Sequence, residues 1–322
     1  MNRTKLGLAC LGIGLIAATG FAGWKWWTQE PMPDTSRYEK LISQLEPLHA
    51  KMGPTRSVDW LASHDEPGQT FHEYVTGDPV TPTTDRGTIY IQPLGEFSEQ
   101  QRKIVNAASE YLELCYNLPV KVADDISLDA IPERARRIHP TWGDSQILTT
   151  YVLDELLPPR LPDDAAAYIC FTTSDLWPGR GWNFVFGQAS LSERVGVWSI
   201  HRKGDPHGTE DEYRTCLLRT IKTAAHETGH MFSMRHCTAY ECTMCGSNSL
   251  AESDRRPLAM CPECVAKICF ATNADPARRF AALETFCREH GLIEEAEFFQ
   301  QSHAAVETAP AAPDAPLQTS SK

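Results

Sequence analysis

The stretch HETGHMFSMRHCTAYECTMCGSNSLAESDRRPLAMCPEC, residues 226–264, says more about the fold and its chemistry than any other part of the chain. It begins with an H-E-x-x-H motif, and the TIKTAA sequence before it has neither Pro nor Gly and can be helical. A spacing of four residues places His226 and His230 on one helix face, about 6 Å apart, which suits two ligands of one tetrahedral metal ion. Glu227 lies beside the first of them, where its carboxylate can accept a proton from a metal-bound water.

A third imidazole, His236, follows six residues after His230. Three histidine ligands leave the fourth tetrahedral position open for water, which is the arrangement of a catalytic zinc rather than a structural one. The alternative is that His236 is a surface histidine and that Glu252 supplies the third ligand. The sequence GSNSLAESDRRP around Glu252 is poor helix material, so we favour His236.

Five cysteines are grouped within the same stretch, and their C-x-x-C spacing indicates thiolate metal ligation rather than a disulfide framework. Cys242, Cys261 and Cys264 belong to every four-cysteine set that we consider. Spacing alone favours Cys245 as the fourth member, while Cys237 directly follows His236. Most of the other cysteines are expected to be small buried apolar residues. These are Cys10, Cys115, Cys170, Cys216, Cys269 and Cys287.

The composition is that of an ordinary globular protein of 322 residues, long enough for one large domain or two modest ones. Its formal net charge of -12 argues against nucleic acid or an anionic lipid surface as the main partner. Zinc modules that bind nucleic acid usually lie in basic domains, so the acidic balance also counts against that interpretation of the cysteines.

The N-terminal residues 1–27 predict a membrane-targeting segment, because Arg3 and Lys5 precede an uncharged stretch of near-spanning length. We favour an uncleaved anchor that binds the membrane. A signal peptide cleaved near Gly20 and Ala22, which would give a secreted form, is the alternative. The positive charges at the N-terminus place the bulk of the chain outside the cytoplasm. The predicted location is therefore membrane-anchored, with an extracytoplasmic catalytic domain.

Beyond this segment, residues 28–84 show no catalytic motif and predict a stalk and packing flank, and the Ala/Pro-rich residues 304–322 predict a disordered tail. Strands and helices alternate between them. Strands are expected at 88–94, 118–122, 167–172, 182–186 and 195–199, and helices at 97–117, 145–156, 210–232, 274–290 and 293–303. This alternation predicts an α/β fold, with a mixed sheet because the last strands are too closely connected for a helical crossover.

Taken together, the two metal-binding patterns resemble the archaemetzincin family of zinc metallopeptidases, within the metzincin clan. The resemblance rests on H-E-x-x-H-x-x-S-x-x-H-C-x₄-C-x-M at 226–244, followed by C-x-x-C at 261–264. The IYIQPLG sequence at 89–95 and FVFG at 184–187 are also similar to that family, and the resemblance spans roughly residues 85–270. It implies a metzincin-like mixed twisted sheet with a long active-site helix, a Met-turn and a cysteine-bound structural zinc subsite, in a peptidase domain at 85–303.

The resemblance also implies roles for individual residues. His226, His230 and His236 would bind the catalytic zinc, Glu227 would be the general base and acid, and Met244 would be the Met-turn residue packed beneath the imidazoles. A second, structural zinc would be held by Cys237, Cys242, Cys261 and Cys264, with Cys245 as the alternative to Cys237.

The implied activity is hydrolysis of peptide bonds by a zinc-bound water, with a peptide or protein as substrate. A non-catalytic zinc module that binds a protein partner is the alternative, although such a module would not require the Glu at position 227. The short segment 184–186 is either an ordinary strand or, as in metzincins, an edge strand that pairs with extended substrate.

One departure from the metzincin pattern concerns Ser233, which stands where these enzymes usually have Gly. The Gly allows a left-handed turn that brings the third histidine to the metal, and another residue there costs roughly 1–2 kcal/mol. A structural zinc that holds Cys237 would position the adjacent His236 and offset this cost.

Overall fold

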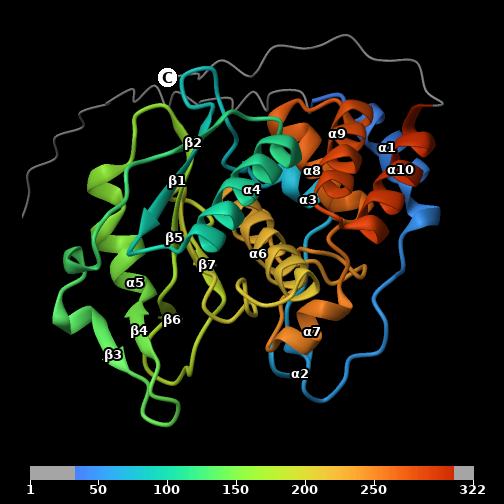
Figure 1. Ribbon diagram of the computed structural model, residues 1–322. Helices are drawn as coiled ribbons and strands as arrows, with labels where there is room; N and C mark the ends of the chain where they lie inside the picture. Colours follow the sequence, from blue (N-terminus) through green and yellow to red (C-terminus); the bar gives the residue numbers. More distant parts are fainter. Residues whose placement is uncertain (1–32, 308–322) are drawn as a thin grey trace, which may run out of the picture. The chain divides into compact units, whose positions relative to one another are not determined.

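The computed structural model describes residues 33–307, and from Asp34 onward they form one compact unit. A five-stranded sheet lies on one side of the unit and most of the helices lie on the other (Figure 1). Its strands are β1 (Thr88–Leu94), β2 (Val120–Val122), β5 (Ala165–Thr172), β7 (Gly187–Ala189) and β8 (Val195–Ser199). They are arranged in the order β2-β1-β5-β8-β7.

This sheet is mixed, as predicted. The four strands β2, β1, β5 and β8 are parallel, whereas the edge strand β7 runs antiparallel to β8. Every residue of β5 and of β8 is buried, because both faces of the sheet are covered.

One face of the sheet packs against α4 (Glu99–Tyr116) and α6 (Glu210–Met231), which also contact each other (Figure 1). Both helices begin with a capping box, from Ser98 and Thr209 respectively, in which the cap side chain and the third helical residue bond each other's backbone N–H. The core between them is apolar, with Ile91, Phe171 and Trp198 contributed by the sheet.

The opposite face carries a smaller, separate core. It is covered by α5 (Thr149–Tyr151), which continues as a π-helical turn at Val152–Leu156, and by a three-stranded sheet. That sheet has the order β3-β4-β6 and consists of β3 (Arg136–Ile138), β4 (Ser145–Leu148) and β6 (Asp175–Trp177).

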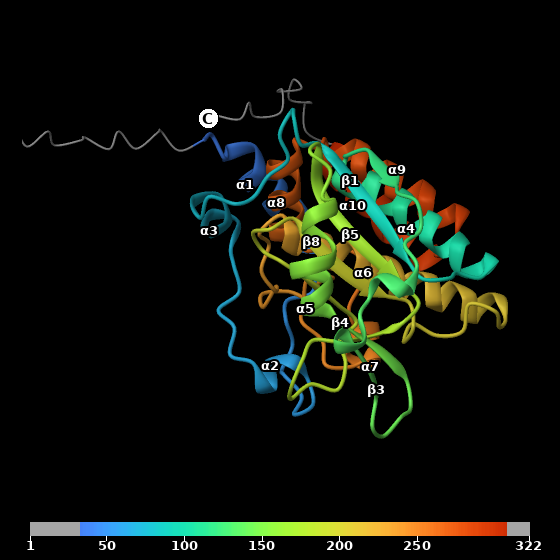
Figure 2. The same ribbon diagram turned by 90° about the vertical axis from the view of Figure 1, so that its left-hand side faces the viewer.

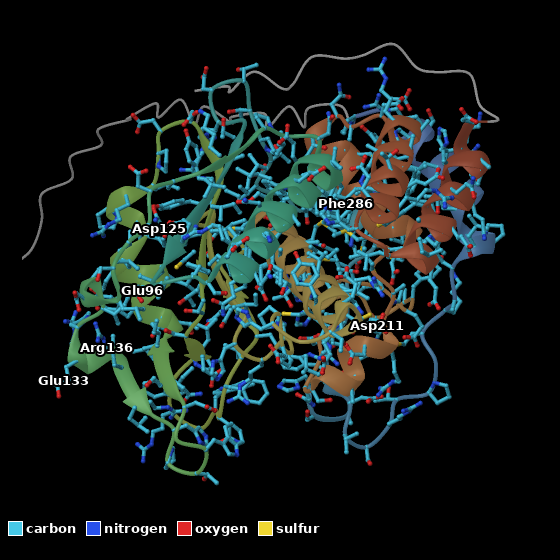
Figure 3. The ribbon with its side chains drawn as sticks, in the orientation of Figure 1. Glu96, Asp125, Glu133, Arg136, Asp211 and Phe286 are labelled. Atoms are coloured by element: carbon cyan, nitrogen blue, oxygen red, sulfur yellow. The ribbon has the colours of Figure 1, made fainter. Side chains whose placement is uncertain are left out.

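A second helical layer lies outside α4. It contains α8 (Pro262–Thr272), α9 (Pro276–Glu289) and α10 (Ile293–Glu307). Figure 3 labels Phe286 of α9, whose ring lies 5.4 Å from the ring of Tyr111 on α4. The helical pair α9 and α10, split at Gly291, agrees with the expected pattern, and α10 continues four residues into the range predicted to be disordered.

Residues 34–84 pack onto this layer. Helix α1 (Ser36–Leu45) contacts α8 and α10, and α3 (Phe71–Thr76) contacts α8, so that the three helices α1, α3 and α8 are grouped in Figure 2. The short helix α2 (Trp60–Ser63) lies between them in the sequence and is linked to α7 (Leu250–Arg255) by a backbone hydrogen bond to Glu252. The division into 1–27, 28–84, 85–303 and 304–322 stays a prediction.

Two predicted elements differ from the structure. The helix expected at 145–156 begins as strand β4, because Gln146 and Ile147 pair with both β3 and β6. The strand expected at 182–186 is a loop with a single bridge between Val185 and Leu176, and pairing with β8 begins only at Gly187.

The expected membrane-anchored location is corrected by the structure. Within residues 33–307, no helix combines the length and the apolar character that crossing a bilayer requires. The longest helix, α6, has 22 residues, but its first turn consists of Glu210, Asp211 and Glu212, and Figure 3 labels Asp211. The segment 1–27, on which the prediction of an anchor and an extracytoplasmic domain rested, lies outside the described residues. We therefore do not retain that prediction.

Candidate metal centres and substrate cleft

Helix α6 carries the H-E-x-x-H motif in its last two turns and ends just beyond it. Ser233 has a left-handed backbone with φ of 62°. The N–H of Met234 bonds the carbonyl of Gly229 at 3.0 Å, and the N–H of Ser233 bonds the carbonyl of His230 at 2.8 Å. This left-handed C-terminal turn reverses the chain so that it can return toward the helix with His236.

The serine hydroxyl explains how a residue other than glycine is tolerated there. It accepts a hydrogen bond from the Val80 N–H at 3.0 Å and donates one to the Leu191 carbonyl at 2.9 Å. These two bonds tie the end of α6 to the N-terminal flank and to the loop between β7 and β8. The expected strain of roughly 1–2 kcal/mol is of the same size as two such bonds, each worth about 1 kcal/mol.

Replacing Ser233 by Ala is expected to lower the free energy of unfolding by about 1–3 kcal/mol, because both hydrogen bonds are lost and the backbone strain stays. Gly should lie between Ser and Ala, since it loses the same bonds but relieves the strain. Denaturant melts of the three zinc-saturated proteins measure the order. An Ala variant as stable as the Ser protein would show that the hydroxyl contributes nothing.

The three histidines of the motif are brought together. The Nε2 atoms of His226 and His230 are 2.9 Å apart, and the ligand atoms of these two residues and of His236 all lie within 4.8 Å of one another. The Nδ1 atom of His226 bonds the Thr243 carbonyl at 2.9 Å, and that of His230 bonds the Met234 carbonyl at 2.7 Å. A carbonyl can only accept, so Nδ1 carries the proton and Nε2 presents its lone pair to the common point.

The ring of His236 is also held through its Nδ1 atom, but by a carboxylate instead of a carbonyl. The Nδ1 atom of His236 lies 2.9 and 3.0 Å from the two carboxylate oxygens of Glu66, which belongs to the N-terminal flank. Sequence analysis missed this residue, because a partner separated by 170 positions produces no local motif. Glu252, the alternative third ligand, lies elsewhere: its carboxylate accepts from the Trp60 N–H at 2.9 Å and the Asn248 N–H at 2.7 Å.

The electrostatics of His226 and His230 fit a zinc ion. Burial and the neighbouring His236 lower the pKa of His230 to about 4, and burial together with the other two rings lowers the pKa of His226 well below its usual value. The rings of His226 and His230 therefore stay neutral, which is the form that binds a metal. Three convergent Nε2 atoms match a zinc site with three protein ligands and an open fourth position.

Glu227 is buried next to this point and faces the edge strand. Burial raises the pKa of its carboxyl group to about 8, and the charge of Lys203 acts in the opposite direction. Gly187 of β7 lies directly against it: a Cβ atom on Gly187 would be 2.6 Å from the Glu227 Oε1. Only glycine fits here, so α6 and the edge strand approach each other at the catalytic carboxylate proposed by the motif.

A cleft of about 630 Å³ opens over these groups. It is lined by strand β7, by the last turns of α6 and by the segment after Met244. The three histidines and Glu227 all line it, as do the indoles of Trp60 and Trp182. The cleft thus places an extended backbone edge beside the candidate metal position.

Met244, expected as the Met-turn residue, packs against helix α6. Its side chain is buried against the H-E-x-x-H helix, and a Cβ atom on Gly229 would be only 2.7 Å from its sulfur. Its carbonyl accepts from the N–H of Cys237 at 2.8 Å, while the preceding Thr243 carbonyl orients His226. The turn around Met244 therefore supports the histidine site and connects it to the cysteines.

Four cysteines form a second group of ligand atoms within 4.8 Å of one another. They are Cys237, Cys242, Cys261 and Cys264. The Cys242 sulfur accepts from the N–H groups of Met244 at 3.4 Å and of Cys261 at 3.2 Å, and Cys261 caps the N-terminus of α8. Four soft sulfur donors at this distance fit a closed structural zinc site.

Cys245 is not a member of this group. Its thiol donates to the Tyr240 carbonyl at 3.2 Å, and the residue lines the substrate cleft. All cysteines in the described range are unpaired, and the five predicted to be small buried residues are indeed buried. Those five are Cys115, Cys170, Cys216, Cys269 and Cys287. Cys10 lies outside the described residues.

A third group of ligand-type side chains consists of Asp144, Asp175 and His201. The guanidinium of Arg202 lies between its carboxylates, at 3.2 Å from Asp144 and 2.7 Å from Asp175. Because this arginine already pairs with both acids, the group is an ion-pair cluster at the smaller sheet, in which Asp175 begins β6 and Asp144 directly precedes β4.

The long helix, the convergent histidines and the adjoining cysteine cluster define the class of zinc metallopeptidases. Residues 166–269 match the family described as Peptidase family M54. The chain is 32% identical to archaemetzincin-2 of Homo sapiens over 291 residues, which cover 77% of this chain and 80% of that relative. The chain belongs to the archaemetzincin family.

Other archaemetzincins have a similar sequence identity to this chain. Archaemetzincin-2 of Rattus norvegicus is 35% identical over 257 residues, covering 70% of this chain and 71% of the relative. The archaemetzincin of Archaeoglobus fulgidus is 32% identical over 182 residues, covering 56% of this chain and 98% of the relative. Among solved structures, the archaemetzincin of Methanopyrus kandleri has a TM-score of 0.49 and 28% identity, covering 60% of this chain and 99% of that chain.

The predicted family and fold class are thus confirmed. The mixed twisted sheet and long helix are present, and the cysteine cluster suits a structural zinc. Family membership makes the chain a zinc metallopeptidase, a hydrolase that acts on peptides or proteins.

Proposed function

We propose that the chain hydrolyses peptide bonds with a catalytic zinc held by His226, His230 and His236, and with Glu227 as general base and then general acid. The observation that carries this proposal is the convergence of three Nε2 lone pairs on one point beside a buried carboxylate. The fixed Nδ1 partners of the rings support it, since they hold the ligand atoms in place before a metal binds.

A zinc ion at such a site supplies Lewis-acid chemistry: it lowers the pKa of a water in its open position and polarises a carbonyl. The protein supplies the proton transfers. The positive charges of Lys203 and of a bound zinc ion favour the ionised form of Glu227 and so oppose the effect of burial. The Glu227 carboxylate then accepts a proton from the attacking water and delivers it to the leaving amine. Its contact with Gly187 fixes the carboxylate against the edge strand, where the scissile bond would lie.

We further propose that an extended substrate adds to β7 as an additional strand. β7 is the last strand of the sheet, and its residues Gly187, Gln188 and Ala189 line the cleft. The pairing with extended substrate that we considered for residues 184–186 is therefore proposed for β7, which lies a few residues later in the chain. Main-chain hydrogen bonds to an edge strand bind peptides independently of their sequence, whereas the cleft beyond them selects side chains.

A second, structural zinc is proposed at Cys237, Cys242, Cys261 and Cys264. Its position one peptide bond from His236 supports a role in positioning the third catalytic ligand. Together the two sites predict two zinc ions per chain. Residues 85–303 would form the peptidase domain, with residues 34–84 packed against it.

Metal analysis combined with a peptide library tests the proposal. The purified protein is expected to contain about two zinc ions per chain and to cleave peptides. Removal of the more weakly bound zinc ion with a chelator should abolish cleavage, and re-addition of zinc should restore it. Two bound zinc ions without turnover on a broad library would instead favour a protein-interaction module.

A further inference from the structure

We propose that Glu66 is a positioning residue of the catalytic metal site, and that Glu66 and Gln69 of the strap, defined as residues 56–69, hold the loop that carries His236. The inference rests on the proposed function, because it concerns how His236 is held as a zinc ligand. Glu66 lies a hundred residues before the segment that matches the family model. No motif in residues 28–84 points to it.

His236 needs such support more than the other two ligands. His226 and His230 belong to α6, whose backbone hydrogen bonds fix their Cα positions. His236 lies in the loop beyond the helix and is reached through the strained turn at Ser233. Its ring is the one that the chain must orient by contacts from elsewhere.

The strap makes these contacts at three points of the loop. The Glu66 carboxylate bonds the His236 ring through Nδ1 at 2.9 Å. The Gln69 side chain accepts from the Arg235 N–H at 3.1 Å and donates to the Ser233 carbonyl at 3.3 Å. One short segment therefore holds both the backbone that carries the third ligand and the ligand itself.

Anchors on both sides of Glu66 keep the strap in place. The Trp60 N–H bonds the buried Glu252 carboxylate, and its indole meets the His236 ring edge-on at a centroid distance of 5.4 Å. At the other end, Gly68 has a φ of 73° and packs so closely on Thr238 that a side chain would collide with its hydroxyl. The carboxylate is thus presented by a fixed backbone.

The chemistry of this contact differs from that at the other two rings. His226 and His230 donate to backbone carbonyls, whereas His236 donates to the side-chain carboxylate of Glu66. A carboxylate partner fixes the tautomer and makes the imidazole a more basic, stronger ligand. The side chains of His236 and Glu66 are only 19% and 28% exposed, so solvent screens the pair less than an ion pair on the surface.

The geometry also distinguishes this role from inhibition. An inhibitory carboxylate would lie on the Nε2 side, at the open metal position. Glu66 instead bonds Nδ1, behind the ring, and within the described residues the group of convergent ligand atoms contains the three histidines without it. The strap therefore supports the site without blocking it.

The test compares Glu66→Ala and Glu66→Gln with Asp65→Asn, a matched control at the exposed neighbouring position. Zinc affinity is measured by competition with a chromophoric chelator. Glu66→Ala should weaken one of the two sites about 10–100-fold, the usual effect of removing such a partner. Glu66→Gln keeps an acceptor but no charge, so it should weaken that site less, and Asp65→Asn should behave as the unmodified protein.

A spectroscopic readout separates positioning from a general structural role. In the cobalt-substituted protein, Glu66→Ala should change the visible d–d bands of the histidine site, while the sulfur-to-metal bands of the cysteine site stay unchanged. Unaltered affinity and spectrum in a folded Glu66→Ala protein would overturn the inference. Failure of the unmodified protein to bind zinc at the histidines would instead overturn the proposed function itself.

Discussion

Replacing Glu227 by Gln is expected to reduce kcat/KM for peptide hydrolysis by about 10²–10⁴-fold, the usual contribution of a positioned general base. An amide cannot accept the proton of the attacking water. Gln has nearly the same shape as Glu, so the close contact with Gly187 and the packing of α6 are kept. Steady-state kinetics on a cleaved library peptide measure the change, with the zinc content determined on the same samples.

The matched control is Glu210→Gln in the first turn of the same helix, where the carboxylate is 75% exposed and pairs with Arg214. This change removes an equal charge far from the cleft and should leave kcat/KM unaltered. Activity retained by Glu227→Gln with full zinc content would rule out Glu227 as the base. Zinc lost in that variant would point to a structural role for the carboxylate.

Replacing Cys261 by Ala should remove the structural zinc and destabilise the fold severely. Zinc binding at such sites contributes about 10–16 kcal/mol in zinc-finger peptides, so its loss exceeds the stability of most domains. Cys261 directly precedes α8, which packs against α1 and α3, so loss of the zinc at this point should extend the damage into the N-terminal flank. Metal analysis and thermal melts of the soluble variant, or its failure to fold, measure the effect.

The pair Cys237→Ala and Cys245→Ala distinguishes the two candidates for the fourth thiolate. Cys237 lies within the sulfur cluster, with its sulfur 3.6 Å from that of Cys261, whereas Cys245 lies outside the cluster. We expect Cys237→Ala to lose one zinc and to lower activity through the adjacent His236. Cys245→Ala should keep both ions. The reverse result would assign the site to Cys245, as the sequence spacing alone suggested.

The parts of the fold that sequence predicted well are those whose residues are apolar on both faces. Strands β1, β5 and β8 lie within two residues of the expected bounds, since continuous β-branched and aromatic runs mark strands in the interior of a sheet. The strands β3, β4 and β6 were not recognised. They are three or four residues long, partly polar and paired with one another, so their pattern is not visible in a single segment.

The residues of the candidate site also fall into two groups, those that the sequence predicted and those that it did not. The residues of the two metal groups lie close together in sequence, at a spacing dictated by helix geometry and by metal coordination, and the structure brings them together. Glu66, Gln69 and Gly187 were missed because their roles come from contacts between distant segments. The sequence showed that Ser233 replaces the usual glycine of the metzincin pattern. The hydrogen bonds to Val80 and Leu191 that offset its backbone strain are not visible in any local pattern.

The distance along the chain between Glu66 and His236 sets an order of events during synthesis. The two residues are 170 positions apart. At a translation rate of about 5–20 residues per second, about 10–30 s therefore pass between the synthesis of Glu66 and that of His236. Cys264, the last of the four cysteines proposed to bind the structural zinc, follows 28 residues after His236. A nascent chain therefore holds no complete catalytic centre until most of it has been made, which delays proteolytic activity until the surrounding fold can form.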